Sequence, residues 1–293
     1  MTTIPRQFMG QSTSRASIEH SRVVLVPIPY DATTSGRSGT RGGPEAIIKA
    51  SLQLEDFDLE LKKNPVEMGI ATANPLEPDV SGPDKMVQRI HEYCRGFHKK
   101  EKFVFVIGGE HTVTVGAARA AVEKHGELSF LQIDAHMDLR DSFEGSPYSH
   151  ACVAKRLWEL GPVTAVGIRN GSQAEYEWIK KHKAPVFWGS EISAGKDDSW
   201  MDLVIQKLTP KVYVTFDIDG LDSSVMPATG TPEPGGLSYH QALKLLKKVS
   251  EKRQVVACDL CELSPTQGLE ACDYTAASIV YKMIGYFALQ FKE

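Results

Sequence analysis

Short apolar runs rich in β-branched residues alternate with amphipathic stretches along most of the 293-residue chain. The runs have the length of strands, and the stretches between them have helical periodicity. Because the runs are apolar at consecutive positions, both faces of the sheet that they form must be covered. The pattern therefore predicts an α/β fold with three layers, in which helices cover both faces of a mostly parallel central sheet.

This rhythm continues without a linker, so we expect one domain over residues 1–293 with an N-terminal arm over 1–21. The predicted strands span residues 23–27, 103–107, 128–133, 164–168, 186–188, 212–216 and 255–260. The predicted helices span about residues 112–124, 153–160, 174–183, 200–208, 239–252 and 274–289. The Gly- and Pro-rich stretches 33–43 and 223–236 are predicted loops, because helix starts follow them at Pro44 and Ser238.

The composition argues against several classes of partner. The net charge is −4, and no run of five like charges or basic stripe occurs, so we expect no nucleic acid and no anionic membrane as partner. Residues 1–21 lack the apolar core of a secretory signal, and the longest apolar runs are far shorter than a membrane span. We therefore expect a cytoplasmic protein that acts on small molecules.

Five cysteines are too few to staple a chain of this length, and only Cys258 and Cys261 have a spacing that suggests zinc or redox chemistry. Residues three apart on a strand point to opposite faces, and no second pair completes four ligands. We interpret these cysteines as buried structural thiols.

Potential metal ligands follow three of the predicted strands. The clusters are Gly108-Gly109-Glu110-His111, Asp134-Ala135-His136-Met137-Asp138 and Asp217-Ile218-Asp219. In extended backbone, residues i, i+2 and i+4 share a face, so the members of each cluster can converge. The carboxyl ends of strands in an open α/β sheet form the ligand crevice, so we expect all three clusters to meet there. The glycine pair predicts a tight turn that brings His111 to the site.

Four converging carboxylates require positive charge. Two like charges about 4 Å apart repel by roughly 4 kcal/mol at an effective dielectric constant of 20, against a total stability of about 5–15 kcal/mol. Four aspartates balance two divalent ions if both histidines are neutral, and oxygen and imidazole ligands without thiolate favour Mn²⁺ over a structural Zn²⁺. Two such ions activate a shared water at neutral pH. One Asp-x-His or Asp-x-Asp motif alone is more often structural, but three at strand ends favour a metal site.

These motifs, together with Thr215-Phe216-Asp217-Ile218-Asp219-Gly220-Leu221-Asp222 and Thr229-Gly230-Thr231-Pro232-Glu233-Pro234-Gly235-Gly236, resemble the signatures of the ureohydrolase family of arginases and agmatinases. The resemblance runs from about residue 23 to the C-terminus. It implies the arginase fold, two Mn²⁺ ions, hydrolysis of a guanidino group to urea and an amine, and a homo-oligomer, either trimer or hexamer. It implies six ligands: His111, Asp134, His136, Asp138, Asp217 and Asp219. The chain departs from the pattern at Glu110, where many members have Asp, and at Ser223, where Pro is usual; neither position is a ligand.

The resemblance also implies catalytic roles for Glu262 and His150 beside the ligand Asp138. Glu262 resembles the carboxylate that binds the guanidinium, for which a bidentate pair is the natural geometry; a solvent-facing glutamate is the alternative. His150 resembles the proton shuttle to the leaving amine, and an exposed loop histidine is the alternative. Thr231 is a weaker candidate for substrate contact, because Gly-Thr-Pro is also an ordinary turn. The other histidines have no assigned role.

The loop over residues 139–149 bears on the substrate. It contains Asp141 and Glu144 against the single cation Arg140, which favours a substrate that ends in an ammonium group. We therefore predict an agmatinase, which would convert agmatine to putrescine and urea in polyamine biosynthesis. Arginine, guanidinobutyrate, aminopropylagmatine and free guanidine are alternative substrates. A non-catalytic ureohydrolase-like binding protein and a zinc amidase that resembles histone deacetylases, with one catalytic ion, are alternatives from other classes.

Overall fold

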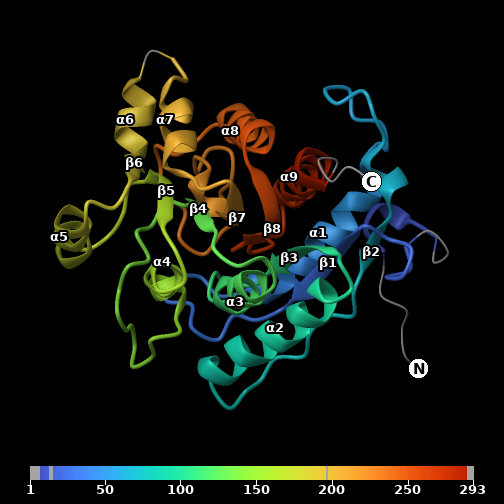
Figure 1. Ribbon diagram of the computed structural model, residues 1–293, viewed down its shortest axis with the longest axis horizontal. Helices are drawn as coiled ribbons and strands as arrows, with labels where there is room; N and C mark the ends of the chain where they lie inside the picture. Colours follow the sequence, from blue (N-terminus) through green and yellow to red (C-terminus); the bar gives the residue numbers. More distant parts are fainter. Residues whose placement is uncertain (1–6, 13–15, 196, 289–293) are drawn as a thin grey trace.

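The central feature of the protein is a parallel sheet of eight strands in the order β2-β1-β3-β8-β7-β4-β5-β6. The computed structural model describes residues 7–12, 16–195 and 197–288. The strands are β1 (Val23–Ile28), β2 (Ile70–Thr72), β3 (Phe103–Gly108), β4 (Ser129–Ile133), β5 (Val163–Ile168), β6 (Val186–Trp188), β7 (Lys211–Asp217) and β8 (Gln254–Cys261). The predicted three-layer α/β fold is confirmed (Figure 1).

Helices pack on both faces of the sheet, as the apolar strands require. The α-helices are α1 (Gly43–Ala50), α2 (Pro83–His98), α3 (Val113–His125), α4 (Val153–Trp158), α5 (Gln173–His182), α6 (Gly189–Ala194), α7 (Trp200–Lys207), α8 (Tyr239–Lys252) and α9 (Glu270–Ala288). Helices α2, α3 and α4 cover one face, and α1, α7, α8 and α9 cover the other (Figure 1). Along β1, Val23 and Leu25 join the core under α8 and α9, whereas Val24 and Val26 join the core under α2 and α3.

Two local predictions are confirmed. Pro44 lies in the first turn of α1, where a missing N–H costs nothing. The Ser238 hydroxyl accepts a hydrogen bond from the backbone N–H of Gln241 and completes a capping box at the start of α8. Cys258 and Cys261 are free and buried, and they lie in cores on opposite faces of the sheet.

Several elements differ from the prediction. Strand β2 and helices α2 and α6 were not predicted, and α9 begins at Glu270 rather than at residue 274. The predicted end of that last helix, residue 289, lies outside the described residues, as do residues 1–6 and 13–15 of the predicted arm. No helix within the described ranges is long and apolar enough to cross a membrane.

The strand order decides where the ligand clusters lie. Strands β3, β8, β7 and β4 are consecutive neighbours in the middle of the sheet. His111 follows β3, Glu262 follows β8, Asp217 and Asp219 lie at the end of β7, and Asp134 follows β4. Because all strands are parallel, these residues emerge at one edge of the sheet, side by side.

Candidate metal centre

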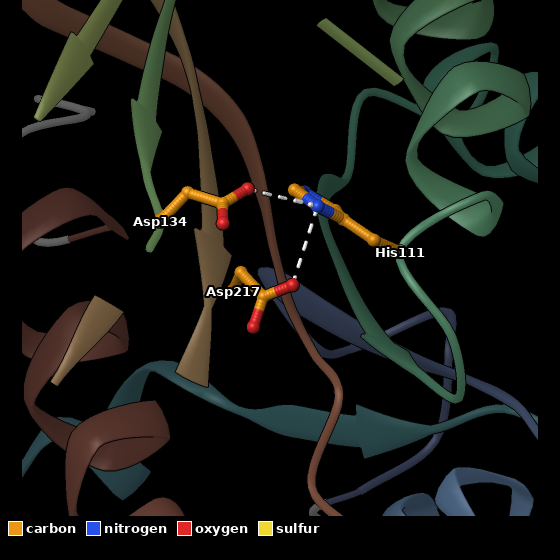
Figure 2. Close-up of side chains that lie close together, drawn as sticks. All are labelled: His111, Asp134 and Asp217. Carbon is orange, nitrogen blue, oxygen red and sulfur yellow. Dashed lines mark ion pairs between the residues drawn. The ribbon is translucent and has the colours of Figure 1, made fainter. Parts of the chain in front are cut away.

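The imidazole of His111 lies among three carboxylates. Its Nδ1 atom is 3.2 Å from a carboxylate oxygen of Asp134, 3.1 Å from one of Asp138 and 3.3 Å from one of Asp217. Figure 2 shows the ring pointing toward Asp134 and Asp217, which extend from the ends of two neighbouring strands. Residues from three different strand ends therefore meet at one atom.

A second group lies beside the first. The Nδ1 atom of His136 is 3.0 Å from Asp219 and 3.7 Å from Asp134. Two sets of three potential ligands result, His111 with Asp134 and Asp217, and His136 with Asp134 and Asp219. Asp134 belongs to both sets, and Asp138 joins the first through its contact with His111. The structure thus brings together all six residues that the sequence predicts as ligands.

The backbone reaches this arrangement by turns rather than by the extended conformation that we predicted. Strand β4 ends at Ile133, the N–H of His136 donates to the Asp134 carboxylate at 2.6 Å, and Asp138 has a positive φ of 51°. Asp219 lies in a 3-10 turn over Ile218–Gly220, and its N–H donates to the Asp217 carboxylate at 3.0 Å. Turns hold both carboxylates close to the strand ends, so short loops deliver ligands to one point.

The crowding of charges perturbs the ionisation of these groups. Burial and the charge of Asp134 raise the pKa of Asp138 to about 7. Burial and the charges of Asp219 and Asp134 raise the pKa of Asp217 well above its ordinary value. Burial opposes the imidazolium form of His136, but hydrogen bonds to Asp134 and Asp219 raise its pKa to about 12. The site therefore attracts positive charge strongly.

The donor set fits two divalent cations. Four carboxylates and two imidazoles supply oxygen and nitrogen ligands without a thiolate, and the shared Asp134 can bridge two adjacent positions. Divalent ions would replace the protons that these groups otherwise hold, because metal ligands bind in their deprotonated forms. The chemistry of the residues is thus that of a binuclear metal centre.

The glycines before His111 are needed for space rather than for an unusual φ angle. A Cβ atom on Gly109 would lie 2.0 Å from the carbonyl oxygen of Tyr30, and one on Gly108 would lie 2.5 Å from the Cys261 sulfur. Such distances exclude any side chain at either position. The close approach lets the turn after β3 pass beside β1 and β8, and it carries His111 to the other ligands.

Glu262 lies in the wall of the same cavity as the ligands. It is buried, has a φ of 68°, and accepts a hydrogen bond from the backbone N–H of His111 at 2.7 Å. Burial and the neighbouring charge of Glu110 raise its pKa well above the ordinary value. A buried carboxylate with spare acceptor capacity favours a cationic ligand, so the predicted alternative of a solvent-facing glutamate is wrong.

His150 also lines this cavity, at the start of a 3-10 turn over His150–Cys152. Its Nε2 atom is 2.9 Å from the Ser35 hydroxyl, and Phe143 packs edge-on against its ring with centroids 5.8 Å apart. Burial lowers the pKa of His150. A neutral imidazole that hydrogen-bonds through its tip is suited to proton transfer.

Sequence reasoning gave no role to the residues that hold His150 in place. The Thr33 hydroxyl accepts a hydrogen bond from the His150 backbone N–H at 3.1 Å, and the same hydroxyl donates to the buried Glu110 at 2.6 Å. Glu110 also accepts the Thr33 N–H at 2.6 Å. The sequence offered one signal, because Glu110 stands where many members of the resembled family have Asp.

The cavity over the ligands has a volume of about 150 Å³. Thr231 lines it and donates a hydrogen bond to Asp219 at 3.4 Å. Its other walls include Arg37, Arg140, Phe143 and Glu175.

The predicted substrate-binding residues Asp141 and Glu144 are not among the residues that line this cavity. Asp141 is exposed and pairs with Arg156 at 2.9 Å, whereas Glu144 is exposed in a turn with a φ of 48°. The structure does not bring these two carboxylates to the site, because the loop directs Arg140 and Phe143 inward instead.

Three histidines without an assigned role have partners away from the cavity. His91 pairs with Glu123 at 2.7 Å, and the buried ring of His98 packs edge-on against His125 with centroids 5.4 Å apart. None of these three rings lines the cavity over the ligands.

Comparisons with known proteins agree with this geometry. The N(1)-aminopropylagmatine ureohydrolase of Synechocystis sp. is 41% identical, with 98% of this chain and 95% of that protein covered. The agmatinase of Pyrococcus horikoshii is 34% identical, with 92% and 94% covered. The crystal structure of the agmatine ureohydrolase of Thermoplasma volcanium superposes with a TM-score of 0.86 at 28% identity, covering 97% and 95% of the two chains. The model of the Arginase family matches residues 21–285, and this chain therefore belongs to the arginase family of ureohydrolases, hydrolytic enzymes that act on guanidino groups.

Proposed function

We propose that the enzyme hydrolyses N1-aminopropylagmatine, in preference to agmatine, to urea and the free polyamine. The observation that carries the reaction class is that five of the six proposed ligands line one cavity with Glu262 and His150, while the sixth, the buried Asp134, contacts His111 and His136 directly behind them. The substrate follows from similarity, since a relative named for N1-aminopropylagmatine is 41% identical and one named for agmatine is 34% identical. The predicted preference for agmatine rested in part on Asp141 and Glu144, which do not line the cavity.

Different residues bind the metal ions and the substrate. His111, Asp134, His136, Asp138, Asp217 and Asp219 hold two divalent ions. When bound, these ions supply Lewis-acid activation of water beside the guanidinium carbon. Glu262 binds the guanidinium with the acceptor capacity that its bond to His111 leaves free.

His150 takes up the proton that the attacking water loses and passes it to the amine as the bond between that amine and the guanidinium carbon breaks. The Ser35 hydroxyl, 2.9 Å from Nε2, holds the ring toward the cavity. Phe143 and the side chain of Met137 give the walls an apolar part that suits the methylene chain of a polyamine.

Manganese is the ion that we propose for both positions. Carboxylate-rich sites with imidazole and no thiolate suit Mn²⁺, whereas structural zinc sites are usually tetrahedral with cysteine ligands. The two ligand sets differ only in which histidine and which aspartate join Asp134, so both positions offer similar chemistry.

One observation favours a second candidate. Arg37 and Arg140 line the cavity, and guanidinium groups are good partners for a carboxylate. A guanidino acid such as guanidinobutyrate would bring its carboxylate to these residues. Arg140 is itself stacked on Phe143 at 5.1 Å and lies 3.9 Å from Glu175, so part of its charge is already compensated.

Urea release decides between these substrates. The Mn²⁺-loaded enzyme is assayed with N1-aminopropylagmatine, agmatine, guanidinobutyrate, arginine and guanidine. We expect kcat/KM to be at least about tenfold higher for N1-aminopropylagmatine than for agmatine, because its three further methylenes each contribute up to about 0.8 kcal/mol when buried. A higher value for agmatine or guanidinobutyrate would replace the proposed substrate. No urea from any compound would support the non-catalytic alternative.

A further inference from the structure

A fully buried carboxylate lies beneath the metal centre, outside the cavity. Asp259 is on β8, directly opposite Thr215 on β7, and its side chain is inaccessible to solvent. Its two oxygens accept hydrogen bonds from the Tyr213 hydroxyl at 2.6 Å and the Thr215 hydroxyl at 2.7 Å, and the Cys261 thiol lies 3.7 Å away. Burial raises the pKa of Asp259, and the hydrogen bonds from Tyr213 and Thr215 oppose that rise because they stabilise the carboxylate.

The Thr215 hydroxyl connects this carboxylate to His111. Its oxygen is 2.8 Å from His111 Nε2. A hydroxyl has one hydrogen, and Thr215 gives that hydrogen to Asp259. The oxygen must then act as an acceptor toward the imidazole, so Nε2 of His111 carries a hydrogen. Hydrogen bonds are therefore donated from His111 to Thr215 and from Thr215 to Asp259.

This direction determines which ring nitrogen remains available. In a neutral imidazole with hydrogen on Nε2, the lone pair is on Nδ1. Nδ1 is the atom that faces Asp134, Asp138 and Asp217 at 3.1–3.3 Å. The buried hydrogen bonds through Thr215 therefore leave the lone pair of His111 Nδ1 free to bind a metal where the carboxylates converge.

We propose that Asp259 is a positioning residue that acts through Thr215 to fix the tautomer of His111, and so sets the affinity of the metal position that His111 shares with Asp134 and Asp217. This inference rests on the metal centre of the proposed function. Groups that orient a metal-binding histidine typically change metal affinity by about 10–100-fold. A purely structural link between β7 and β8 would change stability but not metal affinity.

Variants of the chain's own residues separate these two roles. Thr215→Val removes the link to His111 and leaves the bond between Asp259 and Tyr213. Thr215→Ser keeps the hydroxyl and serves as the conservative rescue. Tyr213→Phe is the matched control, because it removes a hydrogen bond to Asp259 while Thr215 still bridges to His111. Asp259→Asn keeps the shape but brings N–H donors toward a neighbouring hydroxyl.

Metal is removed from the wild-type protein and from each variant, and each is then titrated with Mn²⁺. Electron paramagnetic resonance measures the free Mn²⁺, and the melting temperature of each protein is recorded in parallel. We expect Thr215→Val and Asp259→Asn to weaken one of two binding steps by about 10–100-fold, with Thr215→Ser and Tyr213→Phe within about threefold of the wild type. If Asp259→Asn does not fold, the valine and serine variants at Thr215 decide alone.

Three results would overturn the inference in different ways. Wild-type affinity in both Thr215→Val and Asp259→Asn, with lowered melting temperatures, would leave Asp259 a structural link only. Equal weakening in Tyr213→Phe and Thr215→Val would show that the effect does not pass through the contact with His111. A wild-type protein that binds no Mn²⁺ would overturn both the proposed metal centre and the role of Asp259. This outcome differs from the other two, in which the wild type still binds the metal.

Discussion

The carboxylate of Glu262 accepts the backbone N–H of His111 at 2.7 Å, although the two residues are 151 positions apart in the chain. Strands β3 and β8, which precede them, are neighbours in the sheet. The proposed guanidinium-binding group is therefore fixed relative to a proposed metal ligand by the sheet itself. Such rigid placement is what positions a substrate carbon beside a metal-activated nucleophile.

Glu262→Gln should lower kcat/KM for the preferred substrate by at least about a hundredfold. The amide can still accept the His111 N–H, but it lacks the charge that binds the guanidinium, and hydrogen bonds to charged groups contribute about 1.5–3 kcal/mol each. Urea release and Mn²⁺ content are measured together, and the content should stay at the wild-type value. Glu144→Gln, an exposed change outside the cavity, is the control. Undiminished turnover in Glu262→Gln would remove the residue from substrate binding.

His150→Asn should lower kcat by about 10²–10⁴-fold, the usual contribution of general acid–base catalysis. The change removes the ring that contacts Ser35 and Phe143 but leaves every proposed ligand in place. Steady-state kinetics with metal analysis test it, and His240→Asn, an exposed histidine outside the cavity, is the control. A loss that reflects reduced Mn²⁺ content instead of slower turnover would contradict a role in proton transfer.

Asp141→Asn and Glu144→Gln should each leave kcat/KM for agmatine and N1-aminopropylagmatine within about twofold of the wild type. Both side chains are exposed, and Asp141 pairs with Arg156 away from the cavity. Exposed charges are screened by water and salt, so their influence on a ligand in the cavity is small. A tenfold loss restricted to amine-ending substrates would restore the acidic loop as a determinant of specificity.

The sequence predicted the layers of the fold and the gathering of the ligands, because both follow from local periodicity. Strand-length apolar runs followed by polar clusters place Asp134 and Asp217 at one edge of any parallel sheet. Helix α2 was missed although its signal is present. Met86, Val87, Ile90, Cys94 and Phe97 recur at helical spacing and are buried in the core against β1 and β3.

The orientation of the loop over residues 139–149 and the hydrogen bonds from His111 through Thr215 to Asp259 depend on tertiary contacts, which no local sequence pattern predicts. The side chain of Asp141 is turned outward by Arg156, on helix α4. Asp259 contacts Thr215 only because β7 and β8 pair in one particular register, and the sequence does not specify that register. Glu110 reaches Thr33 across 77 residues. These side chains acquire their roles from tertiary structure.

Asp134→Asn should reduce binding at both metal positions, since Asp134 belongs to both ligand sets. The variant should contain little Mn²⁺ and release urea slowly. Ligands that bind only the folded state add about 2.7 kcal/mol at one hundred times their dissociation constant, so a chelator should lower the melting temperature of the wild type. The same chelator should have little effect on the variant. Wild-type metal content in Asp134→Asn would remove Asp134 from the centre.

Glu60 should contribute to stability in a pH-dependent way. Burial opposes its ionised form, but hydrogen bonds from Tyr286, Lys247 and Lys282 lower its pKa from 4.5 to about 2. Tyr286 and Lys282 lie on α9, and Lys247 lies on α8, so Glu60 ties the segment after α1 to both helices.

A carboxyl whose pKa is lowered on folding stabilises the protein above its unfolded pKa, and this contribution is lost as the pH falls through the folded value. Glu60→Gln should therefore lower the free energy of unfolding by about 1 kcal/mol at pH 7, a modest value because the side chain is 38% exposed. The difference from the wild type should shrink as the pH falls from about 4.5 toward 2. Denaturant unfolding at several pH values measures it. In a Lys282→Met background the effect of Glu60→Gln should be smaller, because one of its three partners is gone. A difference that is independent of pH, or unchanged by Lys282→Met, would show that packing of the side chain, and not its charge, stabilises this corner of the fold.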